Sequence, residues 1–263
     1  MRNLSVLRGV VLLACLSLIL PTIATANGPV VITQAAALQG GISGVCDTPG
    51  FPITICKPGS YVLGSNLTVP ANTDGIDIAV SDVTIDLNGF TLKGPVTCTG
   101  VGATLSCSSS KPANGIASTS SSVRGNMTVR NGTVQGFGQL GVSLTGTGNI
   151  VDGVNADENL ASGIFVWFGT VSNSTSSRNG GGGFVCANGQ LRHNTAYGNG
   201  VAGILLNRCS ATDNATNYNG QYGLSGFHSI VSGNESDGNE VGDFFNEVGL
   251  VSVGNNSCSG VSC

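Results

Sequence analysis

The sequence is poor in charged and in aromatic side chains. Of its 263 residues, only 9% are Asp, Glu, Lys or Arg, and 5% are Phe, Trp or Tyr. So low a charge content argues against a disordered, solvating chain. The 14 acidic residues outnumber the 10 basic ones, which argues against a nucleic-acid partner. Glycine and asparagine take their place, with 41 and 25 copies, and both disfavour helices.

Long apolar runs are lacking beyond the N-terminus. Arg2 and Arg8 precede an apolar run over residues 10–20, and small residues follow up to Ala26. The run is shorter than the roughly 20 residues that a spanning helix needs. The pattern predicts a secretory signal peptide over residues 1–26. We therefore expect a secreted protein, extracellular or periplasmic, without a transmembrane segment and with eight basic against 14 acidic residues, a net charge of −6.

Cysteine, by contrast, is abundant. Cys15 ends a Leu-Leu-Ala-Cys string that resembles a lipoprotein box, so a lipid anchor is the alternative to cleavage after Ala26. The remaining eight cysteines are an even number, which outside the cell indicates disulfides. Short loops are the least costly to close. This favours the pairs Cys46–Cys56, Cys98–Cys107 and Cys258–Cys263.

A repeat of 20 residues runs through the C-terminal half. When the sequence is cut every 20 residues from Asn149, position 11 of each segment is asparagine: Asn159, Asn179, Asn199, Asn219 and Asn239. Positions 3 and 16 are almost always apolar, position 8 is small, and position 15 is glycine in four of five segments. A fixed period of this kind indicates a repeat architecture.

Each repeat is interpreted as one coil of a parallel β-helix. Short apolar–polar alternations are separated by Asn-Gly turns, which is the pattern of strands and not of helices. Stacked coils lie about 4.8 Å apart, so equal positions stack on themselves. Positions 3, 8, 16 and 18 then face inward. Position 11 forms an asparagine ladder, with its backbone in a left-handed turn.

The rest of the chain extends this solenoid. Residues 137–142 align with 219–224, with about two additional residues in that coil, and residues 83–89 resemble 127–132. We expect an N-terminal cap over 27–63 with a short helix near 33–38, coils over 64–248, and a C-terminal cap over 249–263, because solenoid ends need caps. The stretch 93–124 is longer than a coil and predicts an inserted loop stapled by two cysteines. Eight or nine coils result.

These features resemble a known family. The coil pattern, the N-terminal lid and the segment VTIDLNGFTLKG (83–94) are similar to secreted right-handed parallel β-helix proteins of the pectate-lyase-like superfamily. The resemblance implies an all-β, right-handed solenoid and a ligand that is a polysaccharide. Members include lyases, hydrolases, epimerases, tailspikes and adhesins, so the fold does not fix the activity.

One candidate catalytic segment is NTDGID (72–77), which resembles a polygalacturonase motif. It would make Asp74 and Asp77 part of the carboxylate set that such hydrolases need. The family's Asp-Asp, Gly-His-Gly and Arg-Ile-Lys segments do not occur in this sequence. The alternative is an Asp-Gly turn followed by an inward Ile76 on a strand.

A second candidate pair is His193 and Asp213. Both occupy position 5, in adjacent coils, so their Cα atoms should lie about 4.8 Å apart. A histidine oriented by a carboxylate could act as an acid/base pair. The alternative is two turn residues that share a hydrogen bond.

The outward side of the glycine-containing strand predicts a ligand-binding surface. Positions 17 and 19 face out if 16 and 18 face in, and they include Phe165, Trp167, Leu205, Phe227 and Phe245. An exposed apolar stripe usually marks an interaction. The alternative is that the N-terminal segment or the 93–124 loop covers it. No cofactor motif and no metal site is visible, and calcium, although possible, has no column of aspartates to bind.

Cys186 and Cys209 remain after the short-range pairing. Cys186 holds inward position 18, and Leu206 should lie directly above it, three residues before Cys209. This offset predicts a Cα separation above the ~7 Å limit for a disulfide, and therefore buried free thiols.

Three functions follow from the sequence. The first is a carbohydrate-binding or surface structural protein without turnover, motivated by the regular coils and the missing catalytic segments. The second is a polysaccharide lyase or glycoside hydrolase. The third is an adhesin that binds another protein through the apolar stripe. The oligomeric state is not indicated.

Overall fold

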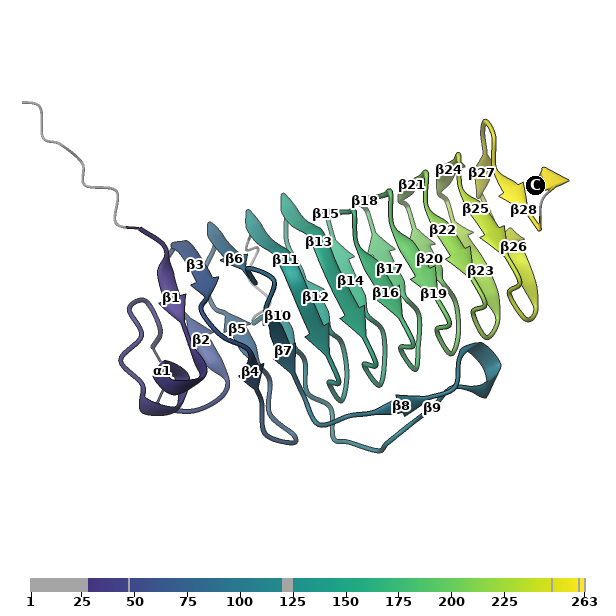
Figure 1. The fold of residues 1–263 in the computed structure, drawn as a ribbon. Coiled ribbons are helices and arrows are strands. Elements are labelled where there is room, and N and C mark those ends of the chain that lie inside the picture. Colours follow the sequence, from purple (N-terminus) through teal and green to yellow (C-terminus); the bar gives the residue numbers. More distant parts are fainter. Residues whose placement is uncertain (1–27, 47, 120–124, 247, 260, 263) are drawn as a thin grey trace, which may run out of the picture.

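The protein is a stack of coils wound along one axis (Figure 1). The computed structural model describes residues 28–46, 48–119, 125–246, 248–259 and 261–262. The expected signal peptide and Cys15 lie outside these residues. Within the described ranges, the helices are too short or too polar to cross a membrane.

The N-terminal end of the stack is closed by a short helix. Strand β1 (Val30–Ile32) leads into α1 (Gln34–Gln39), which confirms the helix expected near 33–38. The Thr33 hydroxyl accepts a hydrogen bond from the Ala36 N–H at 3.1 Å, the usual way to satisfy a free donor at a helix start. Ala37 is buried against the core, so α1 acts as a lid.

Two parallel sheets form the coil walls, and each regular coil supplies one strand to the smaller sheet and two to the larger. Among the described residues the smaller sheet has nine strands. These are β2 (Ile53–Ile55), β5 (Ile76–Ile78), β10 (Ile116–Ser118), β12 (Val142–Leu144), β14 (Ile164–Trp167), β17 (Phe184–Ala187), β20 (Ile204–Asn207), β23 (Tyr222–Phe227) and β26 (Gly242–Asn246). With the final coil of β27 and β28, the stack has about ten turns, slightly more than the sequence predicted.

The larger sheet contains the remaining strands of the coils. Its N-terminal strands, besides β1, are β3 (Gly59–Leu63), β4 (Leu67–Thr68), β6 (Val83–Asp86), β7 (Thr91–Lys93), β11 (Met127–Gln135) and β13 (Asn149–Asp157). The regular coils add β15 (Gly169–Ser172), β16 (Thr175–Ser177), β18 (Gln190–Arg192), β19 (Thr195–Tyr197), β21 (Ser210–Thr212), β22 (Ala215–Asn217), β24 (Ile230–Ser232) and β25 (Glu235–Asp237). The stack ends with β27 (Val251–Ser252), β28 (Ser257–Cys258) and β29 (Val261–Ser262).

The strand register follows the 20-residue repeat. Val151 pairs with Val171, and Val171 with Leu191. One coil earlier the step is 22, because Val129 pairs with Val151, which confirms the two additional residues. The inward columns at positions 3, 8 and 16 are confirmed by burial, with Val151, Ala156 and Ile164 all fully buried. Pairs at equal positions therefore build one continuous core.

Val251 departs from its expected inward place. It pairs with Ile230 of the outward position 2 column, and its side chain is 48% exposed. The corner between β26 and β27 contains one residue more than the equivalent corners, and a slip of one residue turns a strand side chain to the opposite face.

The asparagine ladder is present at position 11. Its members are Asn159, Asn179, Asn199, Asn219 and Asn239, and the first four each donate backbone N–H and Nδ2 to Oδ1 of the next at 2.8–3.0 Å. The left-handed residue is not the asparagine, as expected, but the residue before it. Glu158, Arg178 and Tyr218 have φ of 56°, 48° and 55°. That corner aims both donors of the following asparagine along the stack.

The inserted loop forms a hairpin on the outside of the coils. Strands β8 (Cys98–Thr99) and β9 (Ser106–Cys107) flank a 3-10 turn, η1 (Gly102–Thr104), and run beside several coils (Figure 1). The predicted Cys98–Cys107 disulfide closes the hairpin. The Gly102 N–H donates to the Gly198 carbonyl at 2.9 Å, which docks the hairpin on the corner at position 10.

Disulfides also join other parts of the chain. Cys46–Cys56 is confirmed, with Cα atoms 5.9 Å apart. The expectation of free thiols at Cys186 and Cys209 is wrong, because they form a disulfide with a Cα separation of 6.3 Å. The chain turns a left-handed corner at Arg208 (φ 54°), so three residues do not span their extended length. Cys263, the expected partner of Cys258, lies outside the described residues.

Candidate functional site

The predicted aromatic stripe lies along the outer face of the smaller sheet. Phe165 pairs in register with Val185, Val185 with Leu205, and Ser225 with Phe245. Their neighbours Ile164 and Val166 are fully buried, so the position 17 side chains point away from the core. The column continues toward the N-terminus through Ser143, Ala117, Asp77 and Thr54. We call the position 17 and 19 side chains of β14 to β26 the aromatic face.

The aromatic face is open to solvent. The Trp167 side chain is 45% exposed and Phe245 41% exposed, while Phe165, Leu205 and Phe227 are half-buried. Phe165 and Leu205 line a depression of about 230 Å³ together with Asn207. Tyr222 stacks on Phe245 with ring centroids 4.5 Å apart. The surface is therefore a set of ring faces around a shallow hollow.

The described part of the inserted loop does not cover this face. The β8–β9 hairpin contacts Gly198 and the Glu158 carbonyl, the latter through the Cys98 sulfur at 3.6 Å. Both contacts lie at the corner that follows the larger sheet, away from β14 to β26. Helix α1 lies at the N-terminal end of the stack (Figure 1). The alternative in which either segment covers the stripe is therefore wrong for the described residues.

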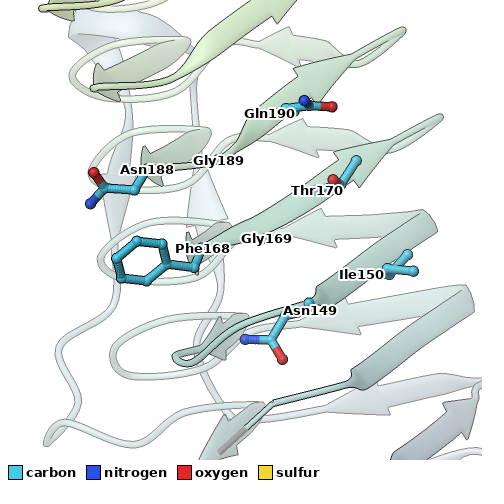
Figure 2. Close-up of a pocket in the computed structure, with 9 residues that line it drawn as sticks. Asn149, Ile150, Phe168, Gly169, Thr170, Asn188, Gly189 and Gln190 are labelled. Atoms are coloured by element: carbon cyan, nitrogen blue, oxygen red, sulfur yellow. The ribbon is translucent and has the colours of Figure 1, made fainter. Parts of the chain in front are cut away.

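A groove that the sequence did not indicate lies at the next corner. Position 20 follows directly after each strand of the smaller sheet and supplies one wall, formed by Phe168, Asn188, Arg208 and His228. Position 2 of the following strand supplies the other wall, formed by Ile150, Thr170, Gln190, Ser210 and Ile230. Figure 2 shows Phe168 and Asn188 on one side, Thr170 and Gln190 on the other, and glycine backbone between them. We call this feature the corner groove.

The corner groove is continuous over four coils. Two depressions of about 340 and 420 Å³ share Phe168, Asn188, Gly189 and Gln190. The four wall residues at position 20 have φ of 47–55°, so a common left-handed backbone points their side chains outward. A Cβ atom at Gly189 would collide with the Gly169 carbonyl. The floor therefore consists of backbone that a ligand can approach closely.

Aromatic stacking joins the groove to the aromatic face at two places. Trp167 stacks on Phe168 with centroids 5.8 Å apart and planes 14° apart. Phe227 stacks on His228 at 4.0 Å and 24°. The two surfaces therefore form one continuous region of ring faces and polar side chains. The signal for the groove was the 20-residue spacing of position 20, which is hidden because its residue types differ.

His193 and Asp213 are brought together as predicted. The His193 Nε2 atom lies 3.5 Å from the Asp213 Oδ2 atom, and the side chains are 60% and 52% exposed. Both residues occupy left-handed corners, with φ of 55° and 53°. Together with Thr195 and Glu235 they line a depression of about 290 Å³. The geometry suits a shared hydrogen bond at a turn and leaves the acid/base role a prediction.

Asp74 and Asp77 occupy different environments. The Asp74 carboxylate accepts a hydrogen bond from the Asn114 N–H at 2.6 Å, which fixes the loop before β10. Asp77 lies on β5, between the fully buried Ile76 and Ile78, and its side chain faces out in the same column as Phe165. The inward Ile76 agrees with the turn-and-strand alternative, and a catalytic role for either aspartate stays a prediction.

Polar residues inside the stack were partly missed. A second ladder at position 6 comprises Asn194, Asn214, Asn234 and Asn256, each donating Nδ2 to the next Oδ1 at 2.9–3.0 Å. The same 20-residue spacing could have revealed it. At another corner, Arg178 pairs with Asp157 at 2.7 Å and Glu158 at 2.9 Å, and the hydrogen bond from Asp157 raises the pKa of Arg178. Within the described ranges, acidic, histidine and cysteine side chains do not gather in groups that could hold a metal ion.

Known structures share this architecture. The enzymatically active domain of tailspike protein 2 from bacteriophage CBA120 aligns with 76% of this chain at 15% identity and a TM-score of 0.50. The chain spans only 38% of that tailspike domain. The A-module of the mannuronan C-5 epimerase AlgE4 from Azotobacter vinelandii aligns with 78% of this chain and 71% of its own, at 14% identity and a TM-score of 0.48.

The comparisons define the class of protein by its fold. No family model matches the sequence, and no curated protein matches it either. The fold is that of the parallel β-helix proteins of the pectate-lyase-like superfamily.

Proposed function

We propose that the protein is a secreted carbohydrate-binding protein whose aromatic face contacts a polysaccharide or surface glycan. The observation that carries the proposal is the outward column of Phe165, Leu205 and Phe245 beside the exposed Trp167. The disulfides support an oxidising compartment. The likeness in fold to an enzymatically active tailspike domain supports a ligand outside the cell.

The surface suits sugar rings for physical reasons. The C–H groups on one side of a pyranose are apolar, and they pack on the flat face of an aromatic ring. Indole and phenyl faces give such contacts at little cost in conformational entropy, because each side chain has only two χ angles. Asn207, at the rim of the hollow beside Phe165 and Leu205, can hydrogen-bond the hydroxyls at the ring edge. Binding without turnover requires nothing further of this face.

The test is a glycan array followed by titration of the best ligand against Trp167→Ala. We expect affinity to fall about three- to tenfold, the value of one aromatic contact. Tyr218→Ala is the matched control, because Tyr218 is 54% exposed and stacks edge-on with Tyr197 at a different corner. Equal affinities of the two variants, or the absence of any glycan ligand, would overturn the proposal. Capture of a protein partner that Trp167→Ala abolishes, without glycan binding, would favour an adhesin.

A second candidate function is a polysaccharide lyase or glycoside hydrolase, favoured by the exposed His193–Asp213 pair at 3.5 Å. A positioned acid/base group contributes roughly 10²–10⁴-fold to a rate. If the array ligand is also cleaved, His193→Ala and Asp213→Asn should each lower turnover by that order and leave binding unchanged. Undiminished turnover in both variants would eliminate this site.

A further inference from the structure

We infer that the corner groove binds an acidic oligosaccharide that lies along the axis of the β-helix, with Arg208 pairing with its carboxylate or sulfate groups. The inference rests on the proposed function in taking a glycan as ligand. It adds a second surface, which the aromatic face does not include, and a charge class for the ligand. The argument uses the spacing of the walls, their charge and the rigidity of the floor.

The walls repeat at the spacing of the coils. Each coil places one position 20 residue opposite one position 2 residue across the groove. The pairs are Phe168 with Thr170, Asn188 with Gln190, Arg208 with Ser210, and His228 with Ile230. Coils rise by about 4.8 Å, close to the length of one sugar unit in an extended chain. An oligosaccharide along the groove therefore meets a new pair of side chains at each unit.

The chemistry changes along the groove in an order that suits such a chain. Phe168, stacked on Trp167, offers a ring face at one end. Asn188 and Gln190 provide amide donors and acceptors in the next coil. Arg208 provides a cation in the third coil, and His228, stacked on Phe227, gives a second flat surface at the far end. Stacking at both ends and polar contacts between them hold a chain of sugars in one direction.

The charge of the groove is opposite to that of the whole chain. The sequence has 14 acidic and 10 basic residues, yet none of the described residues that line the groove is acidic. Arg208 is exposed and, among the described residues, has no carboxylate partner, whereas Arg130 and Arg178 are ion-paired. A guanidinium presents a planar fork that fits a carboxylate or a sulfate with two hydrogen bonds. The free cation therefore selects an anionic ligand.

The backbone beneath Arg208 is held in place. Its N–H donates to the Phe227 carbonyl at 2.9 Å. The next residue, Cys209, is bonded to Cys186 of the previous coil, and its sulfur accepts a hydrogen bond from the Gly189 N–H at 3.2 Å. A fixed floor lowers the entropy cost of ligand binding. The groove is thus formed before the ligand arrives.

The experiment is calorimetric titration of the protein with three hexasaccharides. They are an oligogalacturonate with carboxylates, a sulfated dextran oligomer, and neutral cellohexaose. We expect an acidic hexamer to bind and Arg208→Gln to weaken it at least about tenfold, the value of a hydrogen-bonded charge contact. Arg208→Lys should recover part of the affinity, because it keeps the charge and loses the fork. Preference between the first two hexamers identifies the anionic group.

The matched control is Lys93→Gln, which removes an equal charge from an exposed residue of β7. It should leave the affinity for the acidic hexamer unchanged, and thermal unfolding should show that Arg208→Gln is folded. The inference is overturned if Arg208→Gln binds the acidic hexamer as tightly as Lys93→Gln does, or if neither acidic hexamer binds. If Trp167→Ala still abolishes binding of a neutral glycan in that case, the proposed function stands and only this inference fails.

Discussion

Asn199 and Asn219 lie one coil apart, and both the backbone N–H and the Nδ2 of Asn199 donate to Oδ1 of Asn219 at 3.0 Å. In turn, Oδ1 of Asn199 accepts two hydrogen bonds from Asn179, and its Nδ2 also reaches the Ser176 carbonyl. Asn199 is fully buried. One side chain therefore satisfies groups on both neighbouring coils.

Replacing this side chain should be costly. Asn199→Ala leaves the Asn179 donors and the Ser176 carbonyl without their partner in a buried place, and each such group costs about 1–3 kcal/mol. We expect the free energy of unfolding to fall by at least about 3 kcal/mol, measured by urea denaturation. Asn155→Ala, at an exposed strand position of β13, should stay within about 0.5 kcal/mol. Similar losses in both variants would contradict a stabilising ladder.

The Cys186–Cys209 disulfide gives a second prediction. The mature protein, digested without reduction, should yield a linked peptide pair that contains both residues. The double variant Cys186→Ala/Cys209→Ala should lose about 3 kcal/mol of unfolding free energy, because the denatured chain is no longer constrained. Alkylation of both cysteines without prior reduction would show that the bridge is absent.

Asp152 gives a prediction about pH. Its Oδ1 accepts hydrogen bonds from the Ser172 hydroxyl at 2.7 Å and the Asn173 amide at 2.8 Å, and the bond from Ser172 is the main reason that the pKa of Asp152 is lowered. A lowered pKa in the folded state stabilises the fold above the unfolded pKa of about 4. That contribution is lost as the pH falls through the lower folded value.

Ser172→Ala should raise the pKa of Asp152 toward its ordinary value, as measured by a carboxyl NMR titration. The pH-dependent part of its destabilisation should be present near pH 7 and absent near about pH 2, where the carboxyl is protonated in both states. Ser109→Ala, at an exposed site outside the coils, should leave the Asp152 titration unchanged. An unshifted Asp152 pKa in Ser172→Ala would contradict the hydrogen bond as the cause.

The 20-residue period made the fold predictable. Equal positions must stack when coils pair in register, so the position 11 asparagines and the inward columns followed from spacing alone. The second ladder was harder to find, because Val154 and Ser174 occupy position 6 in the first two coils. The Val251 column shifted because one corner has an additional residue.

The candidate sites were predictable only where side-chain type repeats. Phe165, Leu205 and Phe245 share apolar character, and their column was predicted. Phe168, Asn188, Arg208 and His228 share a left-handed backbone instead of a residue type, so the sequence offered no visible column. The Cys186–Cys209 bridge was missed for a related reason, since the corner at Arg208 folds back a distance that the sequence counts as extended.

The corners also determine how the length of this protein can change. The coil from β11 to β13 absorbs two additional residues at residues 145–148, between two strands, and the ladder continues across it. A duplicated or deleted block of 20 residues would preserve every pairing, whereas one residue inserted inside a strand would turn its core side chains to solvent. The corner groove can therefore lengthen or shorten only in whole coils. The protein is a ruler whose graduations are repeats, and its reach along a ligand is set by their number.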